Sequence, residues 1–251
     1  MHTIDLWGIR VDAYSPESVI SWIQESSGHK RMLLNHNLHS TYLHLTNEHF
    51  RALYSQSDLT LVDGMPILAA LSLRRLKAGQ APYGPSRRCG STDWIPLVGQ
   101  MGAGTRIAVI GANASSNTRA VQAIGRLAAG CTVRGWCGYG GKDELIAENF
   151  DSLKQFQPDL VLLGLGMPVQ EQFLLDHWDE LPTAVFATIG GAIDQLSGEQ
   201  SLAPRWTGKL GVEWLWRLAS DPRRLGSRYL IEPFKLLRVT LAFQRERRAN
   251  R

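Results

Sequence analysis

Short apolar runs alternate with longer amphipathic segments over about the first 200 residues of the chain. The short runs are rich in Val, Ile and Leu, which is typical of strands that are buried on both faces of a sheet. The longer segments repeat their apolar positions every three or four residues, as amphipathic helices do. We expect strands at Arg31–Leu34, Leu59–Val62, Arg106–Ile110, Thr132–Trp136, Asp159–Leu163 and Ala184–Ile189.

Capping and turn residues mark the helices between these strands. Ser15 can cap a first helix, because Pro16 and Glu17 follow it directly. Further helices are expected at Leu38–Tyr54, Pro66–Leu76, Ser116–Ala129, Asp143–Phe156 and Pro168–Trp178, with loops at Lys77–Gly90 and Leu196–Gly208. Strands that alternate with helices predict an α/β fold, in which a Rossmann-like, largely parallel sheet is flanked by helices.

The C-terminal part of the chain carries an apolar stripe. Four apolar residues at spacings of four and three share one face of a helix over Tyr229–Phe243. They are Leu230, Phe234, Leu237 and Leu241. The stripe predicts either a terminal helix that docks on the core or a helix that lies in a membrane interface.

Charge is distributed unevenly along the chain. Residues 204–251 contain twelve Lys and Arg against four acids, a net charge of +8, whereas residues 1–203 carry −4. A basic segment of this kind favours an anionic membrane surface. We expect no nucleic-acid partner, because the segment carries no recognised binding motif. The chain therefore divides into an α/β domain, residues 1–203, and a basic helical C-terminal appendage, residues 204–251.

Length and composition narrow the class further. A chain of 251 residues with 44% hydrophobic content can bury the core of one large α/β domain. Its three cysteines form no CxxC pair, which argues against a disulfide framework and a zinc knuckle. The sequence shows no secretory leader and no apolar stretch long enough to span a bilayer, so we expect a cytoplasmic protein.

Polar residues and glycines follow most of the expected strands. Ligands of a parallel α/β sheet bind beyond the carboxyl ends of its strands, so these residues are the candidates for a site. In strand order, the candidates are Asn35 and Asn37; Asp63 and Gly64; Gly111; Tyr139; Gly164, Gly166, Gln170 and Glu171; and Gly191 and Asp194.

Structural roles are open alternatives for several candidates. Asp63 and Gly64 can form only a turn between a strand and a helix. The amides after the first strand can cap the next helix. Gln170 and Glu171 can complement the dipole of their own helix, whose N-terminus can also bind an anion such as a diphosphate.

Several catalytic motifs are missing from the sequence. Gly111 stands without the GxGxxG spacing of a dinucleotide fingerprint, and no GxSxG, HExxH or DxD occurs. A dinucleotide-dependent oxidoreductase is therefore a weaker alternative. A non-enzymatic protein that binds lipid surfaces is a further alternative, supported by the basic appendage alone.

One ordered set of motifs is more specific. It comprises Asn37, "DG" at 63–64, "RRCGSTD" at 87–93, "GY" at 138–139, "PDLVLLGLGMPVQE" at 158–171, "GGAIDQLSG" at 190–198, "AP" at 203–204 and "GVEWLWRLASDPRRLGSRYL" at 211–230. In this order the motifs resemble the bacterial WecG/TagA/CpsF family of glycosyltransferases, over roughly residues 30 to 230.

The resemblance implies an inverting enzyme that needs neither metal nor cofactor. It would move N-acetylmannosamine, its uronic acid or glucose from a UDP-sugar to an undecaprenyl-diphosphate-linked saccharide, in the synthesis of cell-surface polysaccharide. The α/β domain would be catalytic. The appendage would associate with the inner face of the cytoplasmic membrane and close the active site.

The resemblance also implies roles for single residues. Asp63 would be the catalytic base, and Asn35 and Asn37 would line the donor or acceptor pocket. Gln170 would contact the nucleotide sugar, and Arg88 belongs to the substrate-binding set. Three arginines of the appendage would meet the diphosphate, whose developing charge guanidinium groups can offset. They are Arg217, Arg224 and Arg228.

The chain departs from the family pattern at two positions. Leu202 stands where the family commonly has Arg before "AP", which removes a candidate phosphate contact. Asn35 stands where the family often has Thr, which suggests altered selectivity for the sugar or the acceptor.

Overall fold

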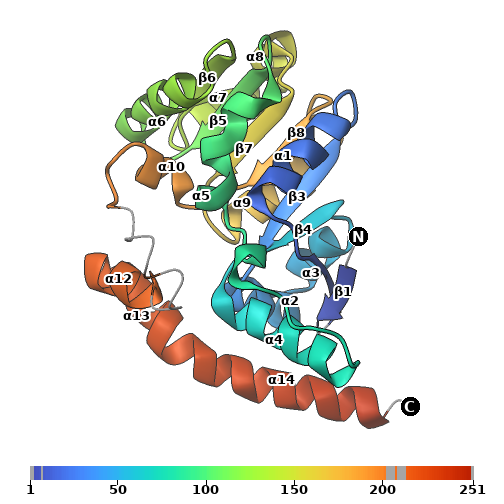
Figure 1. The fold of residues 1–251 in the computed structure, drawn as a ribbon. Helices are drawn as coiled ribbons and strands as arrows, with labels where there is room; N and C mark the ends of the chain where they lie inside the picture. Colours follow the sequence, from blue (N-terminus) through green and yellow to red (C-terminus); the bar gives the residue numbers. More distant parts are fainter. Residues whose placement is uncertain (1–2, 7, 202–206, 208–212, 250–251) are drawn as a thin grey trace.

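The structure is a computed structural model that describes residues 3–6, 8–201, 207 and 213–249. The strands in these ranges form one sheet, in the order β1-β2-β4-β3-β8-β7-β5-β6. Seven strands are parallel, and β1 pairs antiparallel with β2 at one edge. Helices cover both faces of the sheet (Figure 1). The predicted α/β class is confirmed.

The six expected strands lie within two residues of their predicted bounds. They are β3 (Arg31–His36), β4 (Leu59–Val62), β5 (Arg106–Gly111), β6 (Thr132–Trp136), β7 (Leu160–Gly164) and β8 (Val185–Thr188). The sequence analysis missed β1 (Thr3–Leu6) and β2 (Ile9–Asp12). Each has only four residues, and β2 joins the parallel sheet through a single register pair, Asp12 with Leu61.

Alternate strand residues point into two separate apolar layers. In β7, Leu160 and Leu162 pack in one layer, while Val161 and Leu163 pack in the other. The first layer is closed by α1 (Pro16–Glu25), α5 (Ser91–Trp94), η2 (Ile95–Met101), α6 (Ala114–Leu127) and α10 (Ala192–Leu196). The second is closed mainly by α3 (Glu48–Ser55), α4 (Met65–Lys77), α7 (Gly141–Ala147), α8 (Asp151–Phe156) and α9 (Val169–His177).

The helix predicted over Leu38–Tyr54 is two helices, α2 (Leu38–Thr46) and α3. Asn47 separates them in an extended conformation, with φ −131° and ψ 118°. Its side chain accepts a hydrogen bond from the backbone N–H of Phe50 and so caps α3. A polar side chain that bonds to the backbone outside a helix is a common reason for such a break.

The helix predicted over Asp143–Phe156 is also divided, into α7 and α8. Asn149 and Phe150 between them have positive φ values of 50° and 60°. A left-handed conformation costs a bulky residue about 1–2 kcal/mol. Phe150 is buried against Phe173 of α9, and burying a side chain of this size contributes a comparable or larger stabilisation.

The predicted loops have different outcomes. Lys77 is the last residue of α4, and residues 78–90 form the expected loop before α5 apart from the short 3-10 helix η1 (Pro85–Arg87). Of the loop predicted over Leu196–Gly208, residues 202–206 and 208 lie outside the described residues. The boundary predicted between residues 203 and 204 also lies outside them, as does Leu202.

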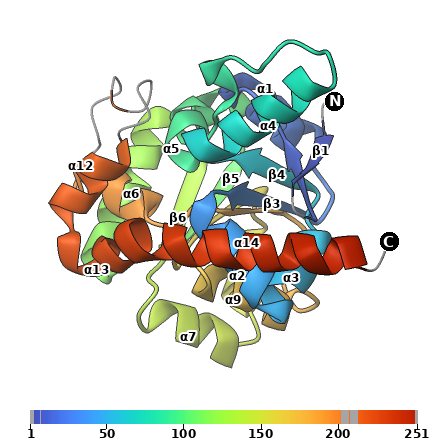
Figure 2. The same cartoon turned by 90° about the horizontal axis from the view of Figure 1, so that it is seen from below.

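The appendage is helical. It comprises α12 (Glu213–Ser220), α13 (Pro222–Gly226), the π-helical segment η3 (Ser227–Ile231) and α14 (Glu232–Ala249). In Figures 1 and 2, α14 crosses the edge of the sheet where α2 begins, and the two helices are in contact.

The apolar stripe of the appendage does not make this contact. Among the residues of α14 whose burial is described, Leu236 is the buried apolar one, at 7% exposure. The stripe residues Leu230, Phe234, Leu237 and Leu241 are 48% to 71% exposed. The docking alternative is therefore right about the position of the helix and wrong about the face that docks.

Candidate active site

The carboxyl ends of β3, β4 and β8 form the centre of the candidate site. After β3 the chain continues to β4, on one side of β3 in the sheet. After β8 it continues to α10, which packs on α6 over the other half of the sheet. Connections that diverge in this way leave a crevice at the strand ends, where α/β proteins bind ligands. Asn35 lies near the end of β3, and Asp63 directly follows β4.

Asp63 is positioned by the backbone on both sides. Its N–H donates to the carbonyl oxygen of His36 at 2.8 Å, which extends the β3–β4 pairing by one bond. Gly64 then turns the chain into α4 with φ 128° and ψ 141°, a conformation that suits glycine. The turn expected at Asp63 and Gly64 is therefore present, and it places the Asp63 side chain at the strand end.

The Asp63 carboxylate has one protein hydrogen bond in the described part of the chain. Its Oδ2 accepts from Nδ2 of Asn37 at 3.2 Å. Its Oδ1 lies against Gly90, where a Cβ atom would come within 2.6 Å of it. The side chain is half-buried. A half-buried carboxylate with one oxygen in a hydrogen bond can accept a proton on its other oxygen.

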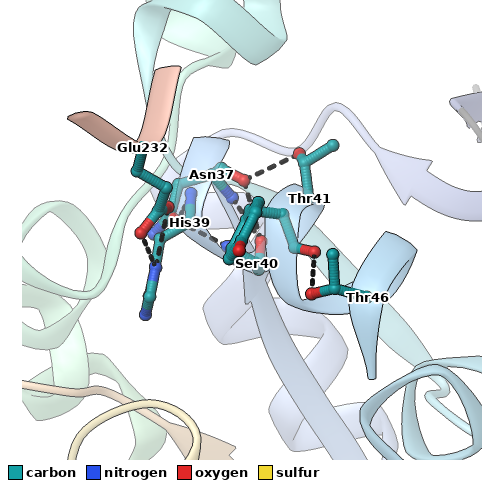
Figure 3. A network of polar contacts seen from close by, with 7 residues as sticks. Asn37, His39, Ser40, Thr41, Thr46 and Glu232 are labelled. Atoms are coloured by element: carbon teal, nitrogen blue, oxygen red, sulfur yellow. Dashed lines mark hydrogen bonds and ion pairs between the residues drawn. The ribbon is translucent and has the colours of Figure 1, made fainter. Parts of the chain in front are cut away.

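Asn37 combines the two roles that the sequence left open (Figure 3). Its Oδ1 caps α2 by accepting from the N–H groups of His39 at 3.0 Å and Ser40 at 3.1 Å. Two N–H donors fix the oxygen on that side of the amide, so Nδ2 must point to Asp63. The capping residue thus also orients the carboxylate.

A buried polar network supports this turn of α2. Ser40 Oγ lies 2.8 Å from the Asn37 N–H and 2.8 Å from Nδ1 of His36. His36 is fully buried, and this burial, together with the charge of His44, lowers its pKa to about 3. His36 is therefore a neutral structural group beneath the site.

Asn35 is held by its amide nitrogen. Nδ2 donates to Ser91 Oγ at 2.9 Å and to the carbonyl oxygen of Thr188. Its backbone carbonyl accepts a 2.6 Å hydrogen bond from Tyr54, whose pKa is raised chiefly by burial and also by Glu171. Asn35 thus connects β3, β8 and α5 at the strand ends.

Arg88 supports the loop that carries Gly90. Its Nη2 lies 3.1 Å from an oxygen of Asp93, and Asp93 in turn accepts a 2.9 Å hydrogen bond from the Gly90 N–H. This pair fixes the glycine against the Asp63 carboxylate. The predicted substrate contact of Arg88 stays a prediction.

Gly111 and Gly164, the last residues of β5 and β7, pack too closely against their neighbours to carry a side chain. A Cβ on Gly111 would lie 2.3 Å from the carbonyl oxygen of Gly164, and one on Gly164 would lie 2.5 Å from Ile193. Gly166 has φ 78°, which favours glycine, and a Cβ on Gly191 would meet little. Ligand contacts at these four glycines stay predictions.

Gln170 and Glu171 are buried at 1% exposure each. Gln170 Oε1 accepts from the Gly190 N–H at 3.0 Å, and Nε2 donates to Glu171 at 2.8 Å. The pair therefore ties the start of α9 to the turn after β8. Both ends of the Gln170 amide are in use, and its predicted contact with the nucleotide sugar stays a prediction.

Other predicted residues are not joined to Asp63 by any contact in the described residues. Tyr139 is highly exposed in the turn after β6, and Asp194 lies half-buried in the first turn of α10. Arg217, Arg224 and Arg228 lie in helical backbone of the appendage, and their side chains are outside what the structure describes.

The appendage contributes a contact that sequence reasoning missed. Both carboxylate oxygens of Glu232 lie 2.8 Å from Nδ1 of His39, in the first turn of α2 (Figure 3). His39 is two residues from Asn37, so α14 docks beside the residue that orients Asp63. The two partners are 193 residues apart, and no local pattern indicates such a pair.

Neither a metal-ligand cluster nor a membrane-spanning helix occurs within residues 3–6, 8–201, 207 and 213–249. These residues include no group of three or more His, Cys, Asp or Glu placed to hold a metal ion. No helix within the same ranges is long and apolar enough to cross a membrane.

A carboxylate oriented by an amide, at the diverging strand ends of a parallel sheet, defines a candidate ligand site of an α/β protein. Comparison with known proteins identifies the class more closely. The chain belongs to the WecG/TagA/CpsF family of glycosyl transferases, whose family model matches residues 4–250. The motifs recognised in the sequence agree with this family.

Curated relatives include proteins of Staphylococcus aureus. Proteins of strains MW2 and NCTC 8325 / PS 47 are each 31% identical over 85 residues, and that of strain MRSA252 is 29% identical over 85 residues. All three are named N-acetylglucosaminyldiphosphoundecaprenol N-acetyl-beta-D-mannosaminyltransferase. Each match covers 34% of this chain and 32% of the relative, so the chain spans about a third of the length of the curated relatives it matches.

Proposed function

We propose that this protein transfers a hexosyl group from a UDP-sugar to an undecaprenyl-diphosphate-linked saccharide, with inversion at the anomeric carbon. The candidate hexoses are N-acetylmannosamine, its uronic acid and glucose. The family supports the class of reaction, and the relatives' names support a lipid-linked acceptor that carries N-acetylglucosamine. The observation that carries the proposal is the Asp63 carboxylate, oriented by Asn37 through Oδ2.

Asp63 would act as the general base. The acceptor hydroxyl attacks the anomeric carbon, and a new C–O bond forms as the bond to UDP breaks. The bonding electron pair leaves with UDP, and the hydroxyl proton passes to Oδ1 of Asp63. General-base assistance of this kind contributes about 10²- to 10⁴-fold to a rate.

The leaving UDP needs positive charge near its diphosphate. The arginines of the appendage, Arg217, Arg224 and Arg228, are the proposed source, because guanidinium groups pair well with phosphate oxygens. The docking of α14 beside the start of α2 supports this role, since it holds the appendage at the same edge of the sheet as Asp63. Chemistry without a metal ion follows from the family resemblance and requires its own test.

The appendage would also bind the inner face of the cytoplasmic membrane. The exposed stripe on η3 and α14, together with the half-exposed Trp214 and Trp216 of α12, supplies apolar surface. The net charge of +8 on residues 204–251 favours anionic lipid. Peripheral binding would bring the site to a lipid-linked acceptor.

Turnover with defined substrates tests the proposed reaction. Purified protein is incubated with several UDP-sugars and a short-chain polyprenyl-diphosphate N-acetylglucosamine, with and without EDTA, and UDP release is measured. We expect turnover in EDTA with at least one donor, and Asp63→Asn should lower kcat by about 10² or more. Asp151→Asn, at an exposed position in α8, is the matched control. A folded Asp63→Asn protein with unchanged kcat would exclude Asp63 as the base.

Vesicle flotation tests the membrane role separately. Phe234→Asp and Leu237→Asp introduce charge into the stripe and should lower the fraction bound to vesicles that contain phosphatidylglycerol. Leu127→Asp changes an exposed leucine of α6, in the α/β domain and not in the appendage, and should leave the bound fraction unchanged. Equal flotation of all three variants and the unmodified protein would overturn the membrane role of the stripe.

A further inference from the structure

The side-chain oxygen of Asn35, Oδ1, is buried and has no hydrogen-bond partner among the described residues. The residue is 4% exposed. Its Nδ2 bonds to the carbonyl oxygen of Thr188, and a carbonyl oxygen can only accept, so the orientation of the amide is fixed. Leaving a buried acceptor unpaired costs about 1–3 kcal/mol. An acceptor maintained at that cost requires an explanation.

The unpaired oxygen belongs to the same edge as Asp63. Leu33 and Leu61 point into one apolar layer, and residues two further along each strand return to that same face. Asn35 and Asp63 therefore share a face at the ends of paired strands. Asn35 bonds to Ser91, while the preceding residue, Gly90, touches the Asp63 carboxylate.

Hydrogen-bond chemistry limits what Asn35 can bind. Both hydrogens of Nδ2 are used by Ser91 and Thr188, so the free part of the side chain is an acceptor and cannot donate. A hydroxyl or an amide N–H satisfies it. A carboxylate offers only acceptors and would place two oxygen dipoles against each other, and a deoxygenated carbon would leave Oδ1 unpaired.

We infer that Asn35 is a specificity-determining residue, whose Oδ1 accepts a hydrogen bond from a neutral hydroxyl or amide N–H of the hexose ring that lies against Asp63. The inference rests on the proposed function and deepens it. A site built to bond a polar group rejects an analogue without that group more strongly than an apolar pocket rejects a missing methylene. The ring is that of the donor or that of the acceptor, and both offer such groups.

Equilibrium binding tests this inference without requiring turnover. Calorimetry gives Kd for the unmodified protein, Asn35→Ala and Ser91→Ala. The donor arm uses UDP-N-acetylmannosamine, its 3-, 4- and 6-deoxy forms and the corresponding uronic acid. The acceptor arm uses short-chain polyprenyl-diphosphate N-acetylglucosamine and its 3-, 4- and 6-deoxy forms. Ser91→Ala removes the hydroxyl bonded to Nδ2 and keeps Oδ1.

We expect one analogue, in one arm, to bind about 10- to 100-fold more weakly than its parent, which corresponds to a buried hydrogen bond worth about 1.4–2.8 kcal/mol. Ser91→Ala should keep the ratio of the analogue's Kd to the parent's Kd. Asn35→Ala should reduce that ratio to about one. The arm that responds identifies the ring. Asn35→Ser, which retains a hydroxyl on the strand, should give the same result if Asn35→Ala fails to fold.

Two outcomes overturn the inference, and they differ in what they say about the proposed function. If every ratio is the same in Asn35→Ala as in the unmodified protein, Oδ1 makes no contact with the sugar and is satisfied by water, while the proposed function stands. If the unmodified protein binds none of these donors or acceptors, the proposed function fails and this inference fails with it.

Discussion

Gly90→Ala tests whether the position of the Asp63 carboxylate limits the reaction. A Cβ at residue 90 would lie 2.6 Å from Oδ1 of Asp63, well inside the normal contact distance. The carboxylate must therefore move by roughly half an ångström or more. The backbone of Gly90, with φ −93° and ψ 173°, is in a region that alanine adopts freely, so the substitution itself causes no backbone strain.

The expected effect is on catalysis rather than on folding. Misplacing a reacting group by about 1 Å can cost about 10²-fold in rate, so we expect kcat to fall about 10- to 100-fold. Gly90 caps α5, and alanine is a poorer cap by about 1 kcal/mol, which corresponds to a Tm decrease of about 2–4 °C for a domain of this size.

UDP release at saturating donor and acceptor measures kcat, and thermal unfolding measures Tm. Gly84→Ala in the same loop is the matched control, because its Cβ would meet nothing closer than 3.9 Å, and it should keep the unmodified kcat. In an Asp63→Asn background, Gly90→Ala should cause little further loss, since both changes act on one group. The reasoning is refuted if Gly90→Ala keeps kcat within twofold of the unmodified protein.

Three further predictions follow from the described contacts. Because burial lowers the pKa of His36 to about 3, the unfolded state binds a proton between pH 6.5 and 3 that the folded state does not. The free energy of unfolding should therefore fall below pH 6.5 by up to about 1.4 kcal/mol per pH unit in urea titrations, and His36→Gln should remove that slope. Glu232→Gln weakens the pair with His39, so amide hydrogen exchange in α14 should accelerate while exchange in β5 stays unchanged; equal protection of α14 would contradict this. Cys89 is fully buried and burial raises its pKa, so a thiol-disulfide exchange reagent should label it only after unfolding, and labelling in the folded protein would show otherwise.

The sequence indicates the main strands well, because strands buried on both faces leave a continuous apolar run. It indicates the breaks in the helices poorly. The positive φ of Phe150 follows from burial of its ring against α9, which depends on a residue 23 positions further along. The strands β1 and β2 have only four residues each, and β2 joins the parallel sheet through β4, some 50 residues further along, which no local pattern indicates.

The sequence likewise indicates some features of the candidate site and not others. Asp63 is recognisable as an acid next to a glycine after a strand, but its orientation depends on Asn37 and Gly90, which are 26 and 27 positions away. Capping a helix and orienting a carboxylate require the same amide, so sequence alone could not separate these roles for Asn37. The burial of Gln170 was equally hidden, because its partner Gly190 belongs to the next strand end.

The two faces of α14 give the appendage a geometric consequence. One side carries Leu236 and the docking contacts with α2, and the stripe lies on exposed surface. One side of the helix can therefore pack on the α/β domain while the other side contacts a separate surface. An α-helix with its side chains is about 10 Å in diameter, so a surface that binds the stripe lies about that far from the start of α2. In the proposed function α14 would thus act as a spacer of fixed thickness, which sets the height of Asp63 above the lipid that carries the acceptor.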